Sequence, residues 1–183
     1  VNVALRGPIE ELRDEFLTAV SEQSGEDSTR SDFEGDSLQG SGMVSLLDER
    51  LVSVVYEFWV EWAGAADVDE RVESVLVDLK TGTELNLGDL FVSGSPWLAT
   101  VGFFARQELL NQLGTAGLWA DGRGLELEAA NYAVFGVRSE GLVFRFGLHQ
   151  VAPGTAGTPE AIIGWASLVG LIDPEGIAAH LVN

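Results

Sequence analysis

The side chains best suited to hold a metal ion lie in one short acidic segment. Asp67, Asp69 and Glu70 offer carboxylate oxygens of the kind that a hard cation such as calcium prefers. Their spacing, however, lacks the glycine and the later glutamate of a calcium-binding loop. The chain has no cysteine, and its two histidines are not spaced as a metal-binding pair. We therefore expect a solvated acidic loop, with no metal and no cofactor.

A second pattern points to nucleophilic catalysis. Residues 35–38 read G-D-S-L, the nucleophile block of GDSL-type hydrolases. That chemistry places the serine at the end of a buried strand and activates it with a later aspartate and histidine. Here the tetrapeptide lies in a polar stretch, and position 177, three residues before His180, is an isoleucine. We expect a chance match and a protein that is not an enzyme.

Other residues are compatible with binding or catalysis but are less specific. Glu126 and Glu128 could form a glycosidase-like carboxylate pair, although such pairs are common in a chain with 29 acidic residues. His149 could be a pH-sensitive contact or a hydrogen-bonded residue at a strand end. Three tryptophans could stack on sugars or pack in the core; these are Trp59, Trp62 and Trp97.

Composition limits the classes of partner. The 183 residues suffice for one domain with a substantial core, and 46% of them are hydrophobic. The formal net charge is −19, from 29 acidic and 10 basic residues. Such a charge repels phosphate backbones, so we expect no nucleic-acid partner, and it attracts cationic proteins. A solvated acidic surface that aids solubility is the alternative explanation.

The first half of the chain predicts one helix and a strand meander. Apolar residues at three- and four-residue steps predict a helix over residues 8–23, with Pro8 in its first turn. Residues 24–42, rich in Ser, Gly and acids, predict a mobile loop. Residues 43–47 and 51–60 predict a hairpin, followed by a strand over residues 71–78. In residues 51–60 the even-numbered side chains are expected to face the core.

The second half predicts a helix over residues 96–113, with Ser95 as its N-cap, and then more strands. Strands are expected over residues 132–137, 142–148 and 161–165, and short helices over residues 167–171 and 174–181. Helices packed against antiparallel strands make this a single α+β domain over residues 1–183.

Three motifs together resemble one known family. Residues 78–91 read D-L-K-T-G-T-E-L-N-L-G-D-L-F, residues 141–146 read G-L-V-F-R-F, and residues 150–153 read Q-V-A-P. In this order they are similar to the RsiV-like domain, domain of unknown function 3298. That domain occurs in the anti-sigma factor RsiV, a lysozyme receptor, and as the non-catalytic module of PdaC-type peptidoglycan deacetylases. The resemblance covers residues 43–171 and implies an extracytoplasmic bacterial domain, with a membrane anchor expected upstream of Val1.

The chain departs from the family pattern in two loops. Family members usually carry Gly-Gly-Ala-His after the aromatic strand, whereas residues 63–67 here read A-G-A-A-D. An aromatic residue usually follows Val-Ala-Pro, whereas glycine and threonine follow here. The resemblance implies that these loops present the ligand-binding residues, and the candidates are Gly64, Asp67, His149, Pro153, Gly154 and Thr155. The changes alter the anchors that such a ligand would use.

Three functions follow as hypotheses. The first is a non-catalytic ligand-binding or sensor domain at the bacterial cell surface, whose partner is a cationic protein such as lysozyme. The second is an accessory module that binds peptidoglycan for an envelope enzyme, and exposed tryptophans along a groove would favour it. The third is a surface lipoprotein domain with a purely structural role.

Overall fold

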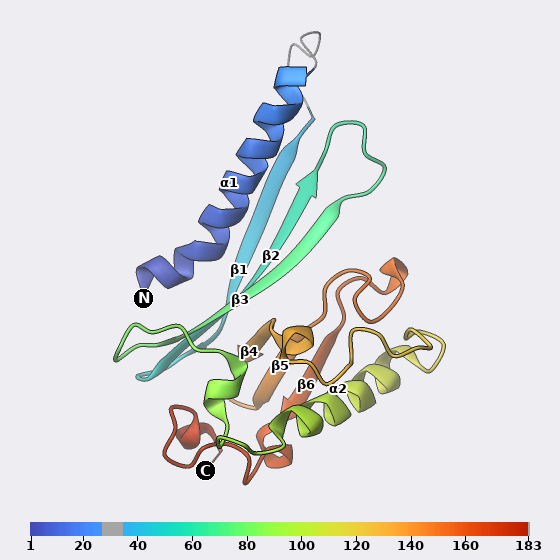
Figure 1. Ribbon diagram of the computed structural model, residues 1–183. Coiled ribbons are helices and arrows are strands. Elements are labelled where there is room, and N and C mark those ends of the chain that lie inside the picture. Colours follow the sequence, from blue (N-terminus) through green and yellow to red (C-terminus); the bar gives the residue numbers. More distant parts are fainter. Residues whose placement is uncertain (27–34, 183) are drawn as a thin grey trace.

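The computed structural model describes residues 1–26 and 35–182 and confirms the α+β class. Its strands form two antiparallel sheets of three strands each, a division that the sequence did not predict. Sheet 1 contains β1 (Ser37–Leu47), β2 (Leu51–Glu61) and β3 (Asp69–Asp78). Sheet 2 contains β4 (Phe135–Val137), β5 (Gly141–Arg145) and β6 (Glu160–Gly164). Helix α1 (Asn2–Glu26) lies along sheet 1, and α2 (Trp97–Leu113) lies along sheet 2 (Figure 1).

Helix α1 is longer than predicted, because it begins before Pro8. Proline lacks the N–H that would bond one turn back, so the sequence suggested a start at this residue. Tertiary contact holds the extra turn: the Tyr56 hydroxyl on β2 donates to the Leu5 carbonyl over 2.6 Å. On the predicted apolar face Leu12 and Val20 are buried, whereas Ile9 stays exposed. Within residues 1–26 and 35–182, no helix combines the length and apolarity needed to cross a membrane.

The loop predicted over residues 24–42 is wrong at both ends. Residues 24–26 continue α1 and residues 37–42 belong to β1, while residues 27–34 lie outside the described part of the chain. Gly40 and Gly42 suggested a flexible segment, but in β1 they give space to aromatic rings of β2. A Cβ atom at Gly40 would lie 2.5 Å from the Phe58 ring, and one at Gly42 would lie 3.0 Å from Tyr56.

Strand β2 is buried on both faces, contrary to the predicted alternation. The even-numbered residues pack under α1 as expected, with Val54, Tyr56 and Phe58 in one core cluster. Ser53 and Val55, on the other face, are also buried, at 0% and 4% exposure. Sheet 2 covers that face, so β2 reads as a central strand of two packed layers rather than a half-solvated one.

Two serine hydroxyls attach β4 to sheet 1. The N–H of Val137 donates to Ser53 Oγ over 3.0 Å, and the N–H of Phe135 donates to Ser74 Oγ over 2.9 Å. Ser45, at the irregularity of β1, adds a 2.9 Å bond between its hydroxyl and that of Ser53. β4 lies at the edge of sheet 2 and pairs with β5 on its other side. Side chains of sheet 1 therefore satisfy backbone donors of β4 that face away from β5.

We expect Ser53→Ala to lower the free energy of unfolding by about 1–2 kcal/mol, because it leaves the buried Val137 N–H without an acceptor. Urea unfolding of the variant and of Ser41→Ala measures the difference. Ser41 lies on β1 and is exposed, so its variant should match the wild type. Equal stability of Ser53→Ala and the wild type would contradict this role.

The segment that leads from β3 to α2 begins with a turn that its Asp and Gly residues favour. Asp78 accepts the Lys80 N–H over 2.7 Å and the Thr81 hydroxyl over 2.9 Å, and Gly82 has the positive φ of 75° that the turn requires. The pKa of the Asp78 carboxyl is lowered, first by the bond from the Lys80 N–H. A 3₁₀ turn, η1 (Leu87–Leu90), and helix α2 follow.

Helix α2 matches its prediction within one residue and buries Val101, Ala105 and Leu109 against sheet 2. Its N-cap position is Pro96, and Ser95 makes no capping bond. The last helices are shorter than predicted, because Gly170 and Gly176 interrupt them. The remaining 3₁₀ turns are η2 (Ala129–Tyr132), η3 (Gly154–Ala156), η4 (Trp165–Ser167) and η5 (Ala179–Leu181).

Candidate ligand-binding surface

The first predicted loop is the exposed connection between β2 and β3, at the upper end of sheet 1 in Figure 1. Gly64 has a φ of 85°, and no atom of residues 1–26 or 35–182 lies within 4 Å of where its Cβ would be. Asp67 is exposed in the same loop. The base of the loop is fixed, because the Ala63 N–H donates to Asp36 Oδ1 over 2.6 Å. The loop thus presents small side chains, one carboxylate and the exposed Val68 to solvent.

The second predicted loop, between β5 and β6, brings His149 and Gly154 together. His149 is exposed and has a positive φ of 63°, which is uncommon for a residue other than glycine. A Cβ atom at Gly154 would lie 2.6 Å from His149 Cε1, so the imidazole lies over this position. Thr155 is exposed and Pro153 is half-buried beside it. A larger residue at position 154 would therefore require the His149 ring to move.

A third segment, which sequence reasoning missed, supports this loop. The Trp119 indole N–H donates to the His149 carbonyl over 3.1 Å, and the Trp119 backbone N–H donates to Val151 over 3.0 Å. The Arg123 guanidinium lies 3.8 Å from the centre of the Trp119 ring. The Trp119–Arg123 pair was detectable as a tryptophan and an arginine four residues apart in a Gly-rich loop. The link between the two predicted loops is indirect: Thr158 donates to Glu70 over 3.2 Å.

The hydrolase motif does not form a catalytic group in the described structure. Ser37 opens β1, and its hydroxyl donates to Glu61 over 3.4 Å. His180 bonds Asp48, just beyond the other end of β1, over 2.8 Å between Nε2 and Oδ2. Eleven residues of strand separate these ends by roughly 35 Å. Ser37 and His180 therefore cannot share a reaction centre in this conformation.

The acidic residues considered for metal binding do not converge. Asp69 pairs with Arg71 over 3.4 Å, and Glu70 accepts the bond from Thr158. Among residues 1–26 and 35–182, no group of three or more His, Asp or Glu side chains is placed to hold a metal ion. Glu126 and Glu128 lie in a loop rather than on a strand, and Glu126 accepts a bond from Asn131 over 3.1 Å.

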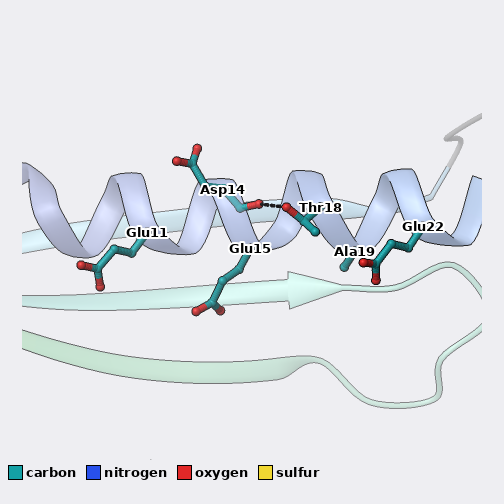
Figure 2. Close-up of a pocket in the computed structure, with 6 residues that line it drawn as sticks. All are labelled: Glu11, Asp14, Glu15, Thr18, Ala19 and Glu22. Atoms are coloured by element: carbon teal, nitrogen blue, oxygen red, sulfur yellow. Dashed lines mark hydrogen bonds between the residues drawn. The ribbon is translucent and has the colours of Figure 1, made fainter.

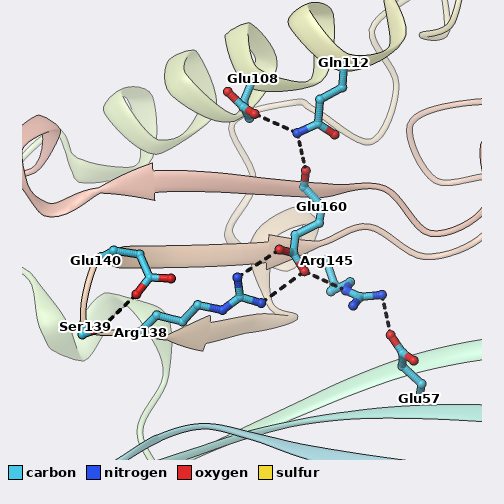
Figure 3. Close-up of polar contacts among 8 residues, drawn as sticks. All are labelled: Glu57, Glu108, Gln112, Arg138, Ser139, Glu140, Arg145 and Glu160. Carbon is cyan, nitrogen blue, oxygen red and sulfur yellow. Dashed lines mark hydrogen bonds and ion pairs between the residues drawn. The ribbon is translucent and has the colours of Figure 1, made fainter.

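A charged network crosses the space between the two sheets (Figure 3). Arg145 on β5 pairs with Glu57 on β2 and with Glu160 on β6, the second pair over 3.2 Å. Arg138 also pairs with Glu160 over 3.2 Å. These side chains are only 20–26% exposed, so the network is shielded from water and acts as a structural connection. Its two arginines are already matched by carboxylates.

Helix α1 carries a different, unbalanced set of charges. Figure 2 shows the carboxylates of Glu11, Glu15 and Glu22 on the side of α1 that faces the strands, with Asp14 on the other side. Arg71 on β3 reaches Glu15 over 2.8 Å. Arg13 pairs with Asp14 over 2.8 Å, away from the other three. Glu11 and Glu22 have no ion pair with any residue in the described ranges. Acidic side chains therefore outnumber basic ones along this surface.

Glu73 shows how crowded this surface is. It lies on β3 opposite α1, in a crevice of about 40 Å³ that Glu11 and Glu15 also line. Partial burial raises the pKa of the Glu73 carboxyl, although the residue keeps contact with solvent. The charges of Glu11 and Glu15 raise this pKa further, and the charge of Arg71 lowers it. Arg71 therefore offsets only part of the repulsion between Glu73 and the carboxylates of Glu11 and Glu15.

We expect Glu73→Gln to stabilise the protein at pH 7, by about 0.5 kcal/mol or less. A carboxyl whose pKa is raised on folding destabilises the folded state above that pKa. The penalty fades as the pH falls through the raised pKa towards the ordinary value of 4.5. Urea unfolding at pH 7 and at pH 4 should show the gain only at pH 7. The exposed Glu175→Gln is the control, and an equal gain at both pH values would contradict the mechanism.

Comparisons with known proteins relate this chain to one protein family. Residues 88–166 match the family model described as "Protein of unknown function (DUF3298)". The matched segment contains α2 and sheet 2, and it is narrower than the range of 43–171 expected from the motifs. Comparison with curated proteins gives no significant match.

Two crystal structures have the same fold. One is a DUF3298 family protein from Pseudomonas aeruginosa PAO1, with a TM-score of 0.60 and 18% sequence identity over 76% of this chain. The chain spans 63% of that protein. The other is a DUF3298 family member from Bacteroides fragilis NCTC 9343, with a TM-score of 0.63 and 15% identity over 97% of this chain and 70% of that one. The chain thus shares the fold of these two proteins, and its residues 88–166 match the model of their family.

Proposed function

We propose that this chain is a non-catalytic, extracytoplasmic ligand-binding or sensor domain of a bacterial cell-surface protein, and that its ligand is a cationic protein such as lysozyme. The observation that carries this proposal is the unbalanced acidic surface of α1 and β3, where Glu11, Glu15 and Glu73 line one crevice together with a single cation, Arg71. A basic partner would relieve this repulsion on binding. The resemblance to RsiV-like domains and the DUF3298 match support the cell-surface assignment.

The charge of the whole chain supports the same class of partner. At a net charge of −19, the chain should attract a basic protein over distances of about one Debye length, and salt should weaken that attraction. An anionic or neutral ligand would gain nothing from this field. The charge therefore favours a cationic protein over the other ligands considered.

Titration against hen lysozyme tests the proposal. The double variant Glu11→Gln/Glu22→Gln removes two charges of the α1 surface, and Glu49→Gln/Glu175→Gln removes two exposed charges elsewhere. We expect the first to weaken binding about three- to tenfold at low salt and the second to weaken it less. Equal effects would assign the attraction to net charge alone, and no binding by the wild type at low salt would refute lysozyme as the ligand.

An accessory peptidoglycan-binding module is the second candidate. The observation in its favour is that Trp62 and Trp97 remain half-exposed although each stacks on another ring, at 5.3 Å from Phe16 and 5.0 Å from Phe91. Pre-positioned indole rings are suited to stacking on sugars. Pull-down of the chain by purified cell wall that persists at high salt would favour this candidate over the cationic protein.

A further inference from the structure

A separate hollow of about 440 Å³ opens beside Trp97, where η1 and η2 meet β3. Its volume is within the range of sites that hold small molecules or single side chains of a partner. Trp97 and Phe135 supply aromatic surface, and Glu84 supplies a carboxylate. Its lining, taken over the described part of the chain, includes no Lys, Arg or His side chain. The hollow thus combines aromatic rings with one negative charge.

The space beside the indole exists because the surrounding residues are small. Ala129, Ala130, Ala133 and Gly88 are among its lining residues. A Cβ atom at Gly88 would lie 3.6 Å from Trp97 Cζ2, an ordinary van der Waals contact, so Gly88 lies close to the indole. Phe91 stacks on the indole with centroids 5.0 Å apart and planes 8° from parallel, which fixes the ring. The indole therefore packs on Phe91 and borders an open space.

The carboxylate of Glu84 is not used by the fold. Its backbone is fixed by a bridge to Val77, but the side chain is exposed. Within residues 1–26 and 35–182 this carboxylate has no hydrogen bond or ion pair. A cation in the hollow would gain an ion pair with Glu84 and a cation–π contact with Trp97, both of which a neutral group lacks.

The geometry points to this hollow as the anchor site for a single Arg or Lys side chain of a basic protein partner. The inference rests on the proposed function, and it names where such a partner would insert. A planar guanidinium suits the site best, because it can stack on an indole while its N–H groups reach a carboxylate. The net charge of −19 favours the same occupant over an anionic one.

Small probes test the site without a protein partner. We expect N-acetylargininamide to shift the indole resonance of Trp97 in ¹⁵N–¹H spectra of the full chain, and its uncharged analogue N-acetylcitrullinamide to do so at least about threefold more weakly. Trp97→Phe identifies the resonance. Equal shifts with the two probes, or no shift with either, would overturn the inference. A shift with N-acetylglucosamine alone would overturn it too and would favour the peptidoglycan candidate.

Matched variants then test the site in the protein complex. Glu84→Gln removes the charge, Ala130→Leu fills the space, and Glu175→Gln removes an equal charge at an exposed position outside the hollow. We expect the first two to weaken lysozyme binding about three- to fivefold and the control to change it by less than twofold. Unchanged binding by both would overturn the anchor site and leave the proposed function standing. Binding of the arginine probe without any lysozyme binding would leave the cation-binding hollow standing and refute lysozyme as the ligand.

Discussion

Gly141→Ala is expected to lower the free energy of unfolding by about 3 kcal/mol or more, the largest effect of any single substitution considered. Gly141 opens β5 within the G-L-V-F-R-F motif. A Cβ atom there would lie 2.2 Å from the Ile163 carbonyl oxygen and 2.8 Å from Gly164 Cα. Both atoms belong to the backbone of β6, so only a shift of one strand against the other could relieve the clash. Thermal and urea unfolding measure the loss.

Gly164→Ala is the matched control, because Gly164 lies directly opposite Gly141 in the β5–β6 pair. A Cβ atom at Gly164 meets nothing closer than 3.7 Å. The two variants have the same chemistry in the same strand pair and differ mainly in the space around the methyl group. We expect the control to change stability by less than about 1 kcal/mol. Equal losses in the two variants would show that strand propensity, not backbone contact, requires glycine at position 141.

Arg145→Met is expected to cost about 2 kcal/mol, the second largest effect. It leaves Glu57 without its cation and removes one of the two cations of Glu160, where both carboxylates are about three-quarters buried. Removing one partner of a buried ion pair commonly costs 3–5 kcal/mol, and the remaining exposure reduces this here. Because Arg145 joins β5 to β2, the loss should appear as weaker cohesion between the sheets.

Two further variants isolate that mechanism. Adding Glu57→Gln to Arg145→Met should recover part of the loss, since the unpaired charge is removed. Arg13→Met breaks a pair of the same type whose members are 57% and 67% exposed, and it should cost less than about 0.5 kcal/mol. If the double variant is as unstable as Arg145→Met, then the loss of packing by the arginine stem, and not the unpaired charge, is responsible.

Local signals in the sequence predicted the elements that local interactions determine. The turn at Asp78 and Gly82 depends on side-chain and φ requirements that lie within five residues. Helix α2 has its apolar stripe and its terminating Gly114 in one continuous segment. The β1–β2 hairpin was likewise predicted from its short connection. In all these cases the residues that determine the element lie close together in the sequence.

Long-range contacts determined what the sequence could not predict. Ser53 and Val55 were assigned to the solvent face of β2, because nothing nearby in the chain shows that sheet 2 covers them. Gly40 and Gly42 were assigned to a loop, because the rings that lie over them belong to another strand. The start of α1 before Pro8 depends on a contact with Tyr56. In each case the deciding partner is distant in sequence.

The same distinction applies to the candidate site. His149 and Gly154 are close in sequence, and the structure brings them into contact. Gly64 and Asp67 lie exposed in their predicted loop. The Glu73 crevice was not predicted, because it needs β3 to meet α1, more than 50 residues earlier in the chain. Contacts of that kind can be inferred from one sequence only once the topology is known.

The most direct test of the proposed function is the association rate of the chain with lysozyme, measured in stopped flow at about 0.01 M and about 0.15 M salt. Attraction between a chain of charge −19 and a basic protein predicts fast association that slows about tenfold or more over this range, with a smaller change in the dissociation rate. The Glu11→Gln/Glu22→Gln variant should lower the low-salt rate. An absence of association at 0.01 M salt, or a rate that does not change with salt, would contradict a cationic protein as the ligand.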